Sequence, residues 1–409
     1  MRILWVCNIP LPEACTLLGL PAVQGGGWMA ALAQRLLRTQ GIILGVLFPA
    51  DGCSAARVEG ERAVYYPVGG GQDIDFAIRD FQPDLIHLHG TESALGCGVI
   101  QRFPDKRCVI SVQGLVSIYA LHFFAGLSLS ERLTFTLRDL VRRDSMLSLH
   151  RRYVQQGETE RTMLRGAKYV VGRTAWDRAC VAAVSAGAEY LPCGEMLRDS
   201  FYNHVWGPDT CERHTIFAPS GSYPIKGLHM ALRTLQSVLE KYPDTVLYVA
   251  GRDILKPSGP FSLGRTGYAK VIRRLIRRLK LEGHVRFTGT LDEAGMCGRY
   301  LSSHVFLLPS SIENSPNSLG EAMSLGLPCV AACVGGVQDL LPDRAAGRLY
   351  PFDEPYMAAF YISEIFENDA LAMTLSSGAR ARAAVTYDRD AILARMLEIY
   401  NHMLKDGTS

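Results

Sequence analysis

The run from 310 to 330, SSIENSPNSLGEAMSLGLPCV, holds one carboxylate ahead of a helix start and another on the helix. Glu313 comes first, Pro316 and the Asn-Ser pair after it favour a first helical turn, and Glu321 lies about two turns further on. Backbone N–H groups and the helix dipole make such a start suitable for a diphosphate. Each carboxylate can accept hydrogen bonds from sugar hydroxyls, so the order suits a nucleotide sugar. The alternative is a capped helix with two solvated glutamates.

A second candidate phosphate site is the run from 217 to 227, FAPSGSYPIKG. It follows an apolar run and precedes a helical pattern. The turn at Gly221 and the charge of Lys226 suit phosphate binding, with the ammonium group acting as a point charge. The alternative is a surface lysine before a helix-starting glycine.

Three consecutive glycines, Gly25, Gly26 and Gly27, lie in a loop before the predicted helix 28–38. Glycine allows the backbone to approach a ligand closely. We therefore expect this loop to contact the diphosphate of the nucleotide sugar or the molecule that accepts the sugar. The triplet is not a dinucleotide fingerprint, because it lies about 18 residues beyond Cys7, where the first predicted strand ends. A flexible connector is the alternative.

Polar side chains also follow three predicted strands of the N-terminal half. Gln113 follows the strand 108–112, and it can hydrogen-bond a sugar hydroxyl but cannot act as a general base. His87 and His89 are two residues apart at the end of another strand, so they share one face. Arg173 follows a third strand. We regard the two histidines and Arg173 as acceptor-side candidates. The alternative is ordinary strand-end residues for the histidines and, at Arg173, a helix start capped by the neighbouring Thr174.

The elements that must position these residues alternate between short apolar runs and helical patterns. Short, continuously apolar strands separated by helices indicate a parallel sheet covered on both faces. The predicted strands are 3–7, 42–48, 64–66, 85–88, 108–112 and 169–171 in the first half, and 215–219, 246–250, 285–288, 305–308 and 329–332 in the second. The sequence therefore predicts an α/β fold of two Rossmann-like, doubly wound domains facing across a cleft.

Domain boundaries follow from a polar stretch, NHVWGPDTCER, that interrupts the alternation at 203–213. A chain of 409 residues is too long for one ordinary domain. We expect an N-terminal acceptor-binding domain over 1–205 and a C-terminal donor-binding domain over 213–389. The last helix, about 390–409, is a candidate to pack back on the N-terminal domain.

Composition excludes several classes of protein. The net charge of +3 argues against a general nucleic-acid binder. The eleven cysteines are scattered without metal-binding spacing, so we expect buried free thiols in a reducing cytoplasm and no metal site. The first apolar run ends at Asn8, too early for a signal peptide, and no stretch is long enough to span a membrane. These observations predict a cytoplasmic protein.

The run ENSPNSLGEAM, followed by GLPCV and VGGVQDL, resembles the E-x7-E signature of the GT-B retaining glycosyltransferases of family 4, also called group 1. The resemblance is strongest from 217 to 341. It implies that Glu313 contacts the donor sugar and that Glu321 binds the ribose hydroxyls. The expected donor-binding set is Glu321, Gly25, Gly26, Gly27, Gly221, Ser222, Asn317, Ser318, Leu319, Arg252 and Thr290, and the catalytic candidates are Glu313, Lys226 and Gln113.

Two positions depart from the family pattern. The family usually has an arginine after the turn glycine that pairs with the lysine on the diphosphate, and this chain has Ser222. Either another cation such as Arg252 takes that role or donor binding is weaker than in the family. Many members have a histidine where this chain has Gln113.

The resemblance also implies a mechanism. The acceptor hydroxyl attacks from the face that the nucleotide leaves, and the departing phosphate oxygen takes its proton. The enzyme positions the substrates and stabilises the leaving diphosphate, without a metal or another cofactor. We expect a UDP- or GDP-sugar as donor and a glycan or lipid-linked saccharide as acceptor. The alternatives are a sugar-nucleotide epimerase of the same architecture and a catalytically idle nucleotide-sugar binding protein.

One segment indicates a membrane partner. Residues 121–165 begin with LHFFAGL and carry eight arginines against five acidic residues, and KVIRRLIRRLK at 270–280 is a second basic stretch. Basic amphipathic helices are typical of peripheral attachment to anionic lipid. We therefore expect the N-terminal domain to meet the inner face of the cytoplasmic membrane. The alternative is a solvated helical face with Phe123 and Phe124 in the core.

Overall fold

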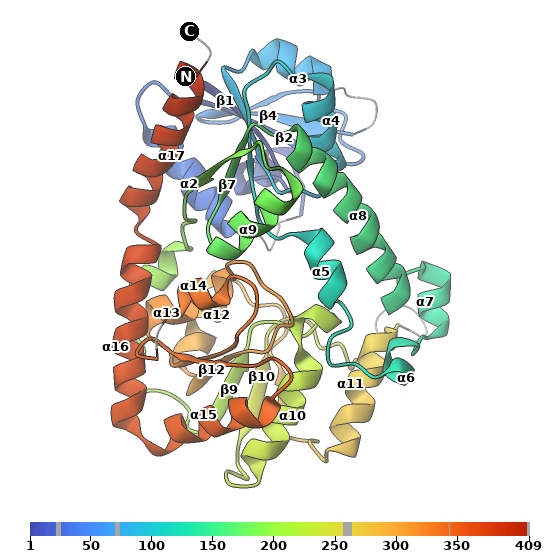
Figure 1. Ribbon diagram of the computed structural model, residues 1–409, viewed down its shortest axis with the longest axis vertical. Helices are drawn as coiled ribbons and strands as arrows, with labels where there is room; N and C mark the ends of the chain where they lie inside the picture. The colour runs from blue at the N-terminus through green and yellow to red at the C-terminus, as the bar shows by residue number, and fades with distance from the viewer. Residues whose placement is uncertain (22–25, 70–73, 257–263, 343, 407–409) are drawn as a thin grey trace. The chain divides into compact units, whose positions relative to one another are not determined.

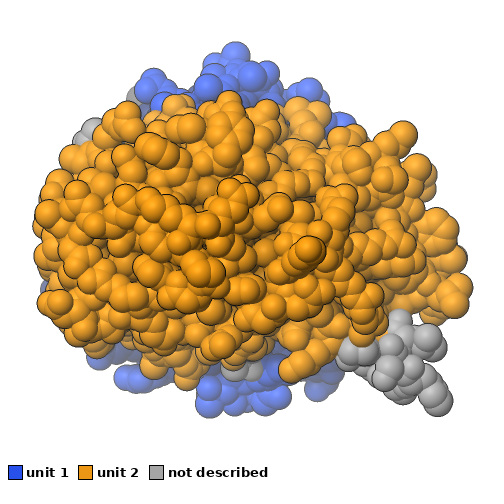
Figure 2. All heavy atoms as spheres, turned by 90° about the horizontal axis from the view of Figure 1, so that it is seen from below, with its two compact units in different colours: residues 1–117, 155–198, 387–409 blue, residues 118–154, 199–386 orange. Residues whose placement is uncertain are grey.

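The computed structural model describes residues 1–21, 26–69, 74–256, 264–342 and 344–406 (Figure 1). The chain divides into two compact units, coloured separately in Figure 2. Unit 1 comprises Met1–Ser117, Gln155–Arg198 and Tyr387–Ser409, and unit 2 comprises Ile118–Val154 and Asp199–Thr386. Compared with the domains expected from the sequence, 118–154 and 199–205 thus belong to the second unit.

Unit 1 is built on an eight-stranded sheet with the order β3-β4-β2-β1-β5-β6-β7-β8. All neighbouring strands are parallel except β3, which runs antiparallel to β4. The strands are β1 (Arg2–Val6), β2 (Ile43–Pro49), β3 (Val58–Glu59), β4 (Ala63–Val68), β5 (Leu85–His89), β6 (Cys108–Ser111), β7 (Tyr169–Gly172) and β8 (Glu189–Pro192). Its helices are α1 (Pro12–Leu18), α2 (Gly27–Arg38), α3 (Ile74–Phe81), α4 (Ala94–Arg102), α9 (Ala175–Val184) and α17 (Arg389–Lys405).

The core of unit 1 contains residues of the first strand and of the last helix. The apolar strands β1 and β2 are almost wholly buried, as expected for a parallel sheet covered on both faces. The last helix, α17, packs against this sheet through Ile399, Tyr400 and Met403. The indole Nε1 of Trp5 on β1 donates to the hydroxyl of Tyr400 at 3.2 Å, so the packing is specific as well as apolar.

Unit 2 is built on a six-stranded parallel sheet with the order β11-β10-β9-β12-β13-β14. Its strands are β9 (Thr215–Ala218), β10 (Val246–Val249), β11 (Val285–Phe287), β12 (Val305–Leu308), β13 (Cys329–Ala332) and β14 (Arg348–Tyr350). Its helices are α6 (Leu129–Arg132), α7 (Leu137–Arg142), η1 (Asp199–Tyr202), η2 (Pro224–Lys226), α10 (Leu228–Leu239), α11 (Gly267–Arg278), α12 (Glu293–Leu301), α13 (Asn317–Leu325), α14 (Val337–Leu340), α15 (Pro355–Glu367) and α16 (Asp369–Thr386). Two more helices, α5 (Val116–His122) and α8 (Met146–Gly166), have residues in both units.

Residues 130–165, within the stretch for which the sequence indicates basic amphipathic helices, contain three helices, α6, α7 and α8. Ser128 and Thr136 each begin a new helix with a capping box, in which side chain and backbone exchange hydrogen bonds across the first turn. Arg143 ends α7 in the left-handed conformation, with φ +52°, and α8 follows. Local capping therefore divides the segment.

The stretch interpreted as a linker is packed against unit 2. Trp206 is 2% exposed, its indole Nε1 donates to the carbonyl oxygen of Ser303 at 2.7 Å, and its amide donates to that of Leu325 at 2.7 Å. A buried tryptophan needs a partner for its N–H group, and this one has it within the unit.

Candidate active site

Glu313 lies in the loop between β12 and α13 and is 6% exposed. The backbone on both sides of it is held: the amide of Asn314 donates to the hydroxyl of Tyr119 at 3.1 Å, and the amide of Gly336 donates to the carbonyl oxygen of Glu313 at 3.0 Å. A Cβ atom on Gly335 would lie 2.0 Å from that carbonyl oxygen, so this position requires glycine. The loop therefore presents the Glu313 carboxylate from a fixed backbone.

Lys226 meets Glu313 directly, with 2.7 Å between Nζ and Oε1. The approach depends on Gly227, which has φ +69° and whose Cβ atom would lie 1.6 Å from the carbonyl oxygen of Pro309. Only glycine lets the turn after β9 close onto the loop after β12. Burial opposes the charge on Lys226, but the carboxylate of Glu313 outweighs it and raises the pKa of the lysine. The site thus holds a charged ammonium group whose side chain is 25% exposed.

The start of α13 follows three residues after Glu313 and has Pro316 as its N-cap. The amide of Leu319 already donates to the carbonyl oxygen of Pro316 at 3.0 Å. The amides of Asn317 and Ser318 therefore come ahead of the first hydrogen bond inside the helix, where α-helices bind anions.

Glu321, on the same helix, is 5% exposed. The buried hydroxyl of Tyr300 on α12 donates to the carbonyl oxygen of Ser318 at 3.0 Å and lies 3.4 Å from Oε2 of Glu321. Tyr300 thus links the first turn of α13 to the carboxylate further along it. No motif pointed to this tyrosine, because it lies on another helix and its role depends on tertiary packing.

Arg252 and Thr290 follow neighbouring strands, β10 and β11. A bridge between Gly251 and Gly289, with 3.1 Å from amide to carbonyl oxygen, brings the two strand ends together. Both side chains are exposed. Near Thr290, the residues Thr288 and Leu291 help to line an open hollow.

The turn after β9 combines one packing residue and one surface residue. A Cβ atom on Gly221 would lie 2.7 Å from Cδ2 of Leu228 and 2.9 Å from Cγ1 of Val249, so this glycine allows close packing. Ser222 next to it is exposed. The exposed position could accommodate the longer cation that the family pattern has there.

In unit 1 the structure brings Gln113 and Arg173 together through Glu195. Nε2 of Gln113 donates to Oε1 of Glu195 at 2.7 Å, and Nη1 of Arg173 binds Oε2 at 2.5 Å. Nη2 of Arg173 also donates to the carbonyl oxygen of Gln113 at 2.7 Å. Glu195 was not singled out in the sequence, because it lies in a loop with no recognisable motif. The network joins the ends of β6, β7 and β8.

His87 and His89 share one face of β5, as their spacing indicates, and their rings stack with centroids 4.0 Å apart. Both nitrogens of His87 are bonded, Nδ1 to the hydroxyl of Tyr400 at 2.7 Å and Nε2 to that of Ser111 at 2.6 Å. Burial lowers the pKa of His87 to about 3. Burial, and then the neighbouring His87, lower the pKa of His89, whose ring contacts Trp28. Both histidines therefore stay neutral and line a small cavity with Arg173 and Glu195.

The glycine loop is only partly described, and Gly25 lies outside the described residues. Gly26 caps α2 with φ +71°, and Gly27 is its first residue. A Cβ atom on Gly27 would lie 2.6 Å from Cγ of Arg198, so packing against that side chain is one reason for glycine here.

The remaining expectations concern metals, thiols and membranes. Among the described residues, no group of three or more His, Cys, Asp or Glu side chains could hold a metal ion. The eleven cysteines are free as expected, but only five of them are buried; five are partly exposed, and Cys333 is exposed. Within the described part of the chain, no helix is both long and apolar enough to cross a bilayer.

Residues 212–382 match the model of a family described as glycosyl transferases group 1. Solved structures show the GT-B fold over nearly the whole chain. Sucrose-phosphate synthase from Thermosynechococcus elongatus superposes with a TM-score of 0.73 at 17% identity, covering 99% of this chain and 100% of that one. Anabaena Alr3699/HepE, solved in complex with UDP-glucose, gives 0.65 at 17% identity, covering 98% and 100%.

A curated relative matches over a shorter stretch. A phosphatidyl-myo-inositol mannosyltransferase from Mycobacterium tuberculosis is 27% identical over 189 residues, which are 45% of this chain and 46% of the relative. The match thus spans less than half the length of that protein. It supports the likeness to this family.

Proposed function

We propose that this protein is a retaining glycosyltransferase that moves a hexose-type sugar from a UDP- or GDP-sugar to a hydroxyl group of a glycan or lipid-linked acceptor. The observation that carries the proposal is the contact of 2.7 Å between Lys226 and Glu313 beside the start of α13. A cation, a carboxylate and the amides of a helix start thus lie in two adjoining loops, the turn after β9 and the loop between β12 and α13. A diphosphate needs the first and third of these, and a sugar ring needs the second.

Each group then has a separate task. Lys226 and the amides of Asn317 and Ser318 would stabilise the charge that develops on the leaving diphosphate. Glu313 would accept hydrogen bonds from donor-sugar hydroxyls, and Glu321 from the ribose. The acceptor hydroxyl would attack from the face that the diphosphate leaves, and a phosphate oxygen would take its proton. This scheme uses no protein nucleophile.

Unit 1 would bind the acceptor. The small cavity beside His89, Arg173 and Trp28 has room for about one water molecule, so an acceptor sugar would bind outside it. The mycobacterial relative is named for a phosphatidyl-myo-inositol acceptor, which supports a lipid-linked one here. We place the protein in the cytoplasm, at the inner face of the cytoplasmic membrane, in surface polysaccharide or glycoconjugate assembly.

The test is incubation with UDP- and GDP-sugars, first alone and then with candidate acceptors. We expect slow release of free sugar without an acceptor, and NMR of the first-formed product should show the anomeric configuration of the donor. Formation of a new sugar nucleotide would instead indicate an epimerase, and no turnover of any donor would indicate a binding protein. Glu313→Gln should depress turnover more than the affinity for the free nucleoside diphosphate.

Chelation tests the role given to Lys226. Because an ammonium group and backbone amides would stabilise the leaving diphosphate, turnover should be the same with and without EDTA. Complete loss on chelation, restored by magnesium or manganese, would contradict the mechanism.

A further inference from the structure

The surface formed by α6, α7 and the turn between them exposes an unusual number of large apolar side chains. Within residues 129–141 six of them are more than half exposed: Leu129 71%, Leu133 52%, Phe135 57%, Leu137 74%, Leu140 59% and Val141 84%. Single exposed apolar side chains are normal on a water-soluble protein, but a contiguous group marks an interaction site. We call residues 129–141 the α6–α7 surface.

Two polar side chains of this segment, those of Thr136 and Asp139, face the protein. Asp139, next to the exposed Leu140, is 1% exposed and accepts from the amide of Gly267 at 2.7 Å. Thr136 donates its hydroxyl to the carbonyl oxygen of Arg265 at 2.9 Å. These bonds dock the α6–α7 surface on the start of α11. Polar groups therefore serve as the anchor to the protein while apolar groups face outward, the reverse of an ordinary surface helix.

The charges around the α6–α7 surface have one sign. Residues 126–154 and 264–281 contain three acidic side chains, and none is exposed. Glu131 accepts from the amide of Ser128 at 2.8 Å, Asp139 is buried, and Asp144 pairs with Arg138 at 2.8 Å. The exposed charged residues in these two stretches are basic: Arg142, Arg143, Arg151, Arg152, Lys270, Arg274, Arg277, Arg278 and Lys280.

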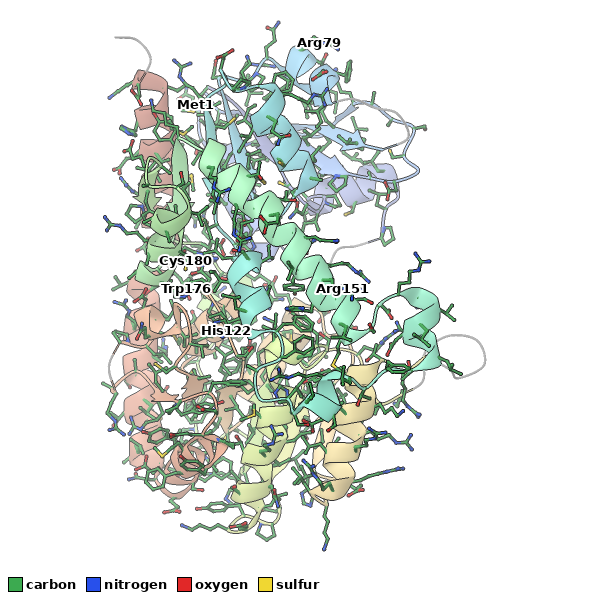
Figure 3. The ribbon with its side chains drawn as sticks, turned by 45° about the vertical axis from the view of Figure 1, so that its right-hand side comes forward. Met1, Arg79, His122, Arg151, Trp176 and Cys180 are labelled. Atoms are coloured by element: carbon green, nitrogen blue, oxygen red, sulfur yellow. The ribbon has the colours of Figure 1, made fainter. Side chains whose placement is uncertain are left out.

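The basic side chains lie beside the apolar ones. Figures 1 and 3 both show α6, α7 and the part of α8 that carries Arg151 next to α11. Helix α11 buries its apolar side, including Val271 and Leu275, and leaves its basic side exposed. Repulsion from Arg277 and then Arg265 lowers the pKa of Arg273 on the same helix. An anionic partner would relieve this repulsion.

We propose that the α6–α7 surface inserts its apolar side chains into the interface of an anionic lipid bilayer, while the arginines of α7, α8 and α11 contact the headgroup phosphates. Exposed apolar side chains match the acyl chains at such an interface, and the surrounding cations match its anionic headgroups. The inference deepens the proposed attachment to the membrane and rests on the proposed function only for the choice of the inner leaflet. It moves the contact from the N-terminal domain expected from the sequence to unit 2.

Phe123 and Phe124, the aromatic residues that first suggested a membrane contact, are not part of the proposed contact. Phe123 is 1% exposed and packs against Tyr153 at 5.4 Å between ring centroids and against His150 at 5.7 Å. Phe124 packs against His150 at 5.0 Å. These rings belong to the packing of unit 2, so the contact depends on residues further along the chain.

The first experiment is co-sedimentation of the full chain with vesicles of phosphatidylcholine alone and with 30 mol% phosphatidylglycerol, about the anionic content of a charged membrane. We expect binding to the anionic vesicles that falls with salt but does not vanish, because the apolar part is not screened. The triple variant L137S/L140S/V141S should bind at least about tenfold more weakly. The matched control F360S/M373S/V385S, which alters three exposed apolar side chains elsewhere in unit 2, should bind like the parent.

Several outcomes would overturn the proposal. Equal binding by the triple variant, an equal loss in the control, or no binding to anionic vesicles at low salt would each do so. Self-association that the triple variant abolishes, without vesicle binding, would assign the surface to a second copy of the chain. As a measurement independent of the triple variant, L137W should show fluorescence that brominated lipid quenches beyond that of the parent, and absence of added quenching would contradict insertion.

Two further measurements separate an error in the membrane proposal from an error in the proposed glycosyltransferase activity. Glu313→Gln should sediment with vesicles as the parent does. The triple variant should hydrolyse the donor in vesicle-free solution at the parent rate. Loss of vesicle-free hydrolysis in the triple variant would show that the surface serves the fold or the site, and would overturn its assignment to lipid.

Discussion

The candidate residues of each unit include one ion pair, and the two pairs differ in what surrounds them. In unit 1, Arg173 and Glu195 are 8% and 9% exposed, and both also bind Gln113. In unit 2, Glu313 is 7% exposed, but Lys226 is 25% exposed. The first pair is enclosed by hydrogen bonds that join three strand ends. In the second pair the lysine side chain is partly exposed, so we expect the first pair to support the fold and the second to support the chemistry.

The largest effect should come from breaking the enclosed pair. Arg173→Met leaves the carboxylate of Glu195 buried without its cation, and such a loss costs about 3–5 kcal/mol of the free energy of unfolding. Chemical denaturation measures it. Replacing both partners in R173M/E195L should recover most of the loss, since no charge is then left unpaired.

The control is Arg178→Met on α9, where the arginine is exposed and a change should stay within about 0.5 kcal/mol. If Arg173→Met keeps the stability of the parent and loses donor turnover instead, the pair in unit 1 is part of the chemistry and the contrast between the units fails.

Breaking the open pair should affect turnover before stability. Lys226→Gln removes the cation that would stabilise the leaving diphosphate, and removal of one such group lowers kcat by about 10²- to 10³-fold. Steady-state donor hydrolysis measures it. Lys241→Gln, which removes an exposed lysine paired with Glu367, should leave kcat unchanged. A parent-like kcat for Lys226→Gln would show that the exposed ammonium group has no part in the reaction.

The comparison also shows which features of the sequence were informative. The two parallel sheets were predictable, because continuous apolar runs such as those of β1 and β12 are buried on both faces. The contact between Lys226 and Glu313 was not predictable, although both residues were singled out in the sequence. It depends on Gly227, whose role appears only when Pro309 comes against it.

Residues that act through tertiary packing left no local signal. Glu195 and Tyr300 each bind a candidate site residue from another element, and Tyr119 binds the backbone next to Glu313. A single sequence does not show which distant residues meet. Helix boundaries between 128 and 146 were missed for a different reason. The capping residues Ser128 and Thr136 were present, but the long run of helix-forming residues concealed them.

A smaller effect is expected at the far end of the open site. If Glu321 binds the ribose, Glu321→Ala removes a charge-assisted hydrogen bond of about 1.5–3 kcal/mol, which weakens nucleoside diphosphate binding by about 10- to 150-fold. Calorimetric titration with UDP and GDP measures it. Glu282→Ala, at an exposed position of the same unit, is the control. Unchanged affinity for both nucleotides would remove Glu321 from the donor site.

The smallest effect should come from Tyr300, which touches Glu321 without being a ligand candidate itself. Tyr300→Phe keeps the ring that packs against Phe217 at 4.9 Å between centroids, but it removes the hydroxyl that links Ser318 to the carboxylate. A hydrogen bond of this kind is worth about 0.5–1.5 kcal/mol, so nucleoside diphosphate affinity should fall by about 2- to 13-fold. Tyr350→Phe is the matched control, because that hydroxyl is equally buried and has no hydrogen-bond partner among the described residues. If Tyr300 acts by positioning the carboxylate, the effect should disappear in a Glu321→Ala background, since there is nothing left to position. An undiminished effect in that background would mean that Tyr300 supports the first turn of α13 through Ser318 instead.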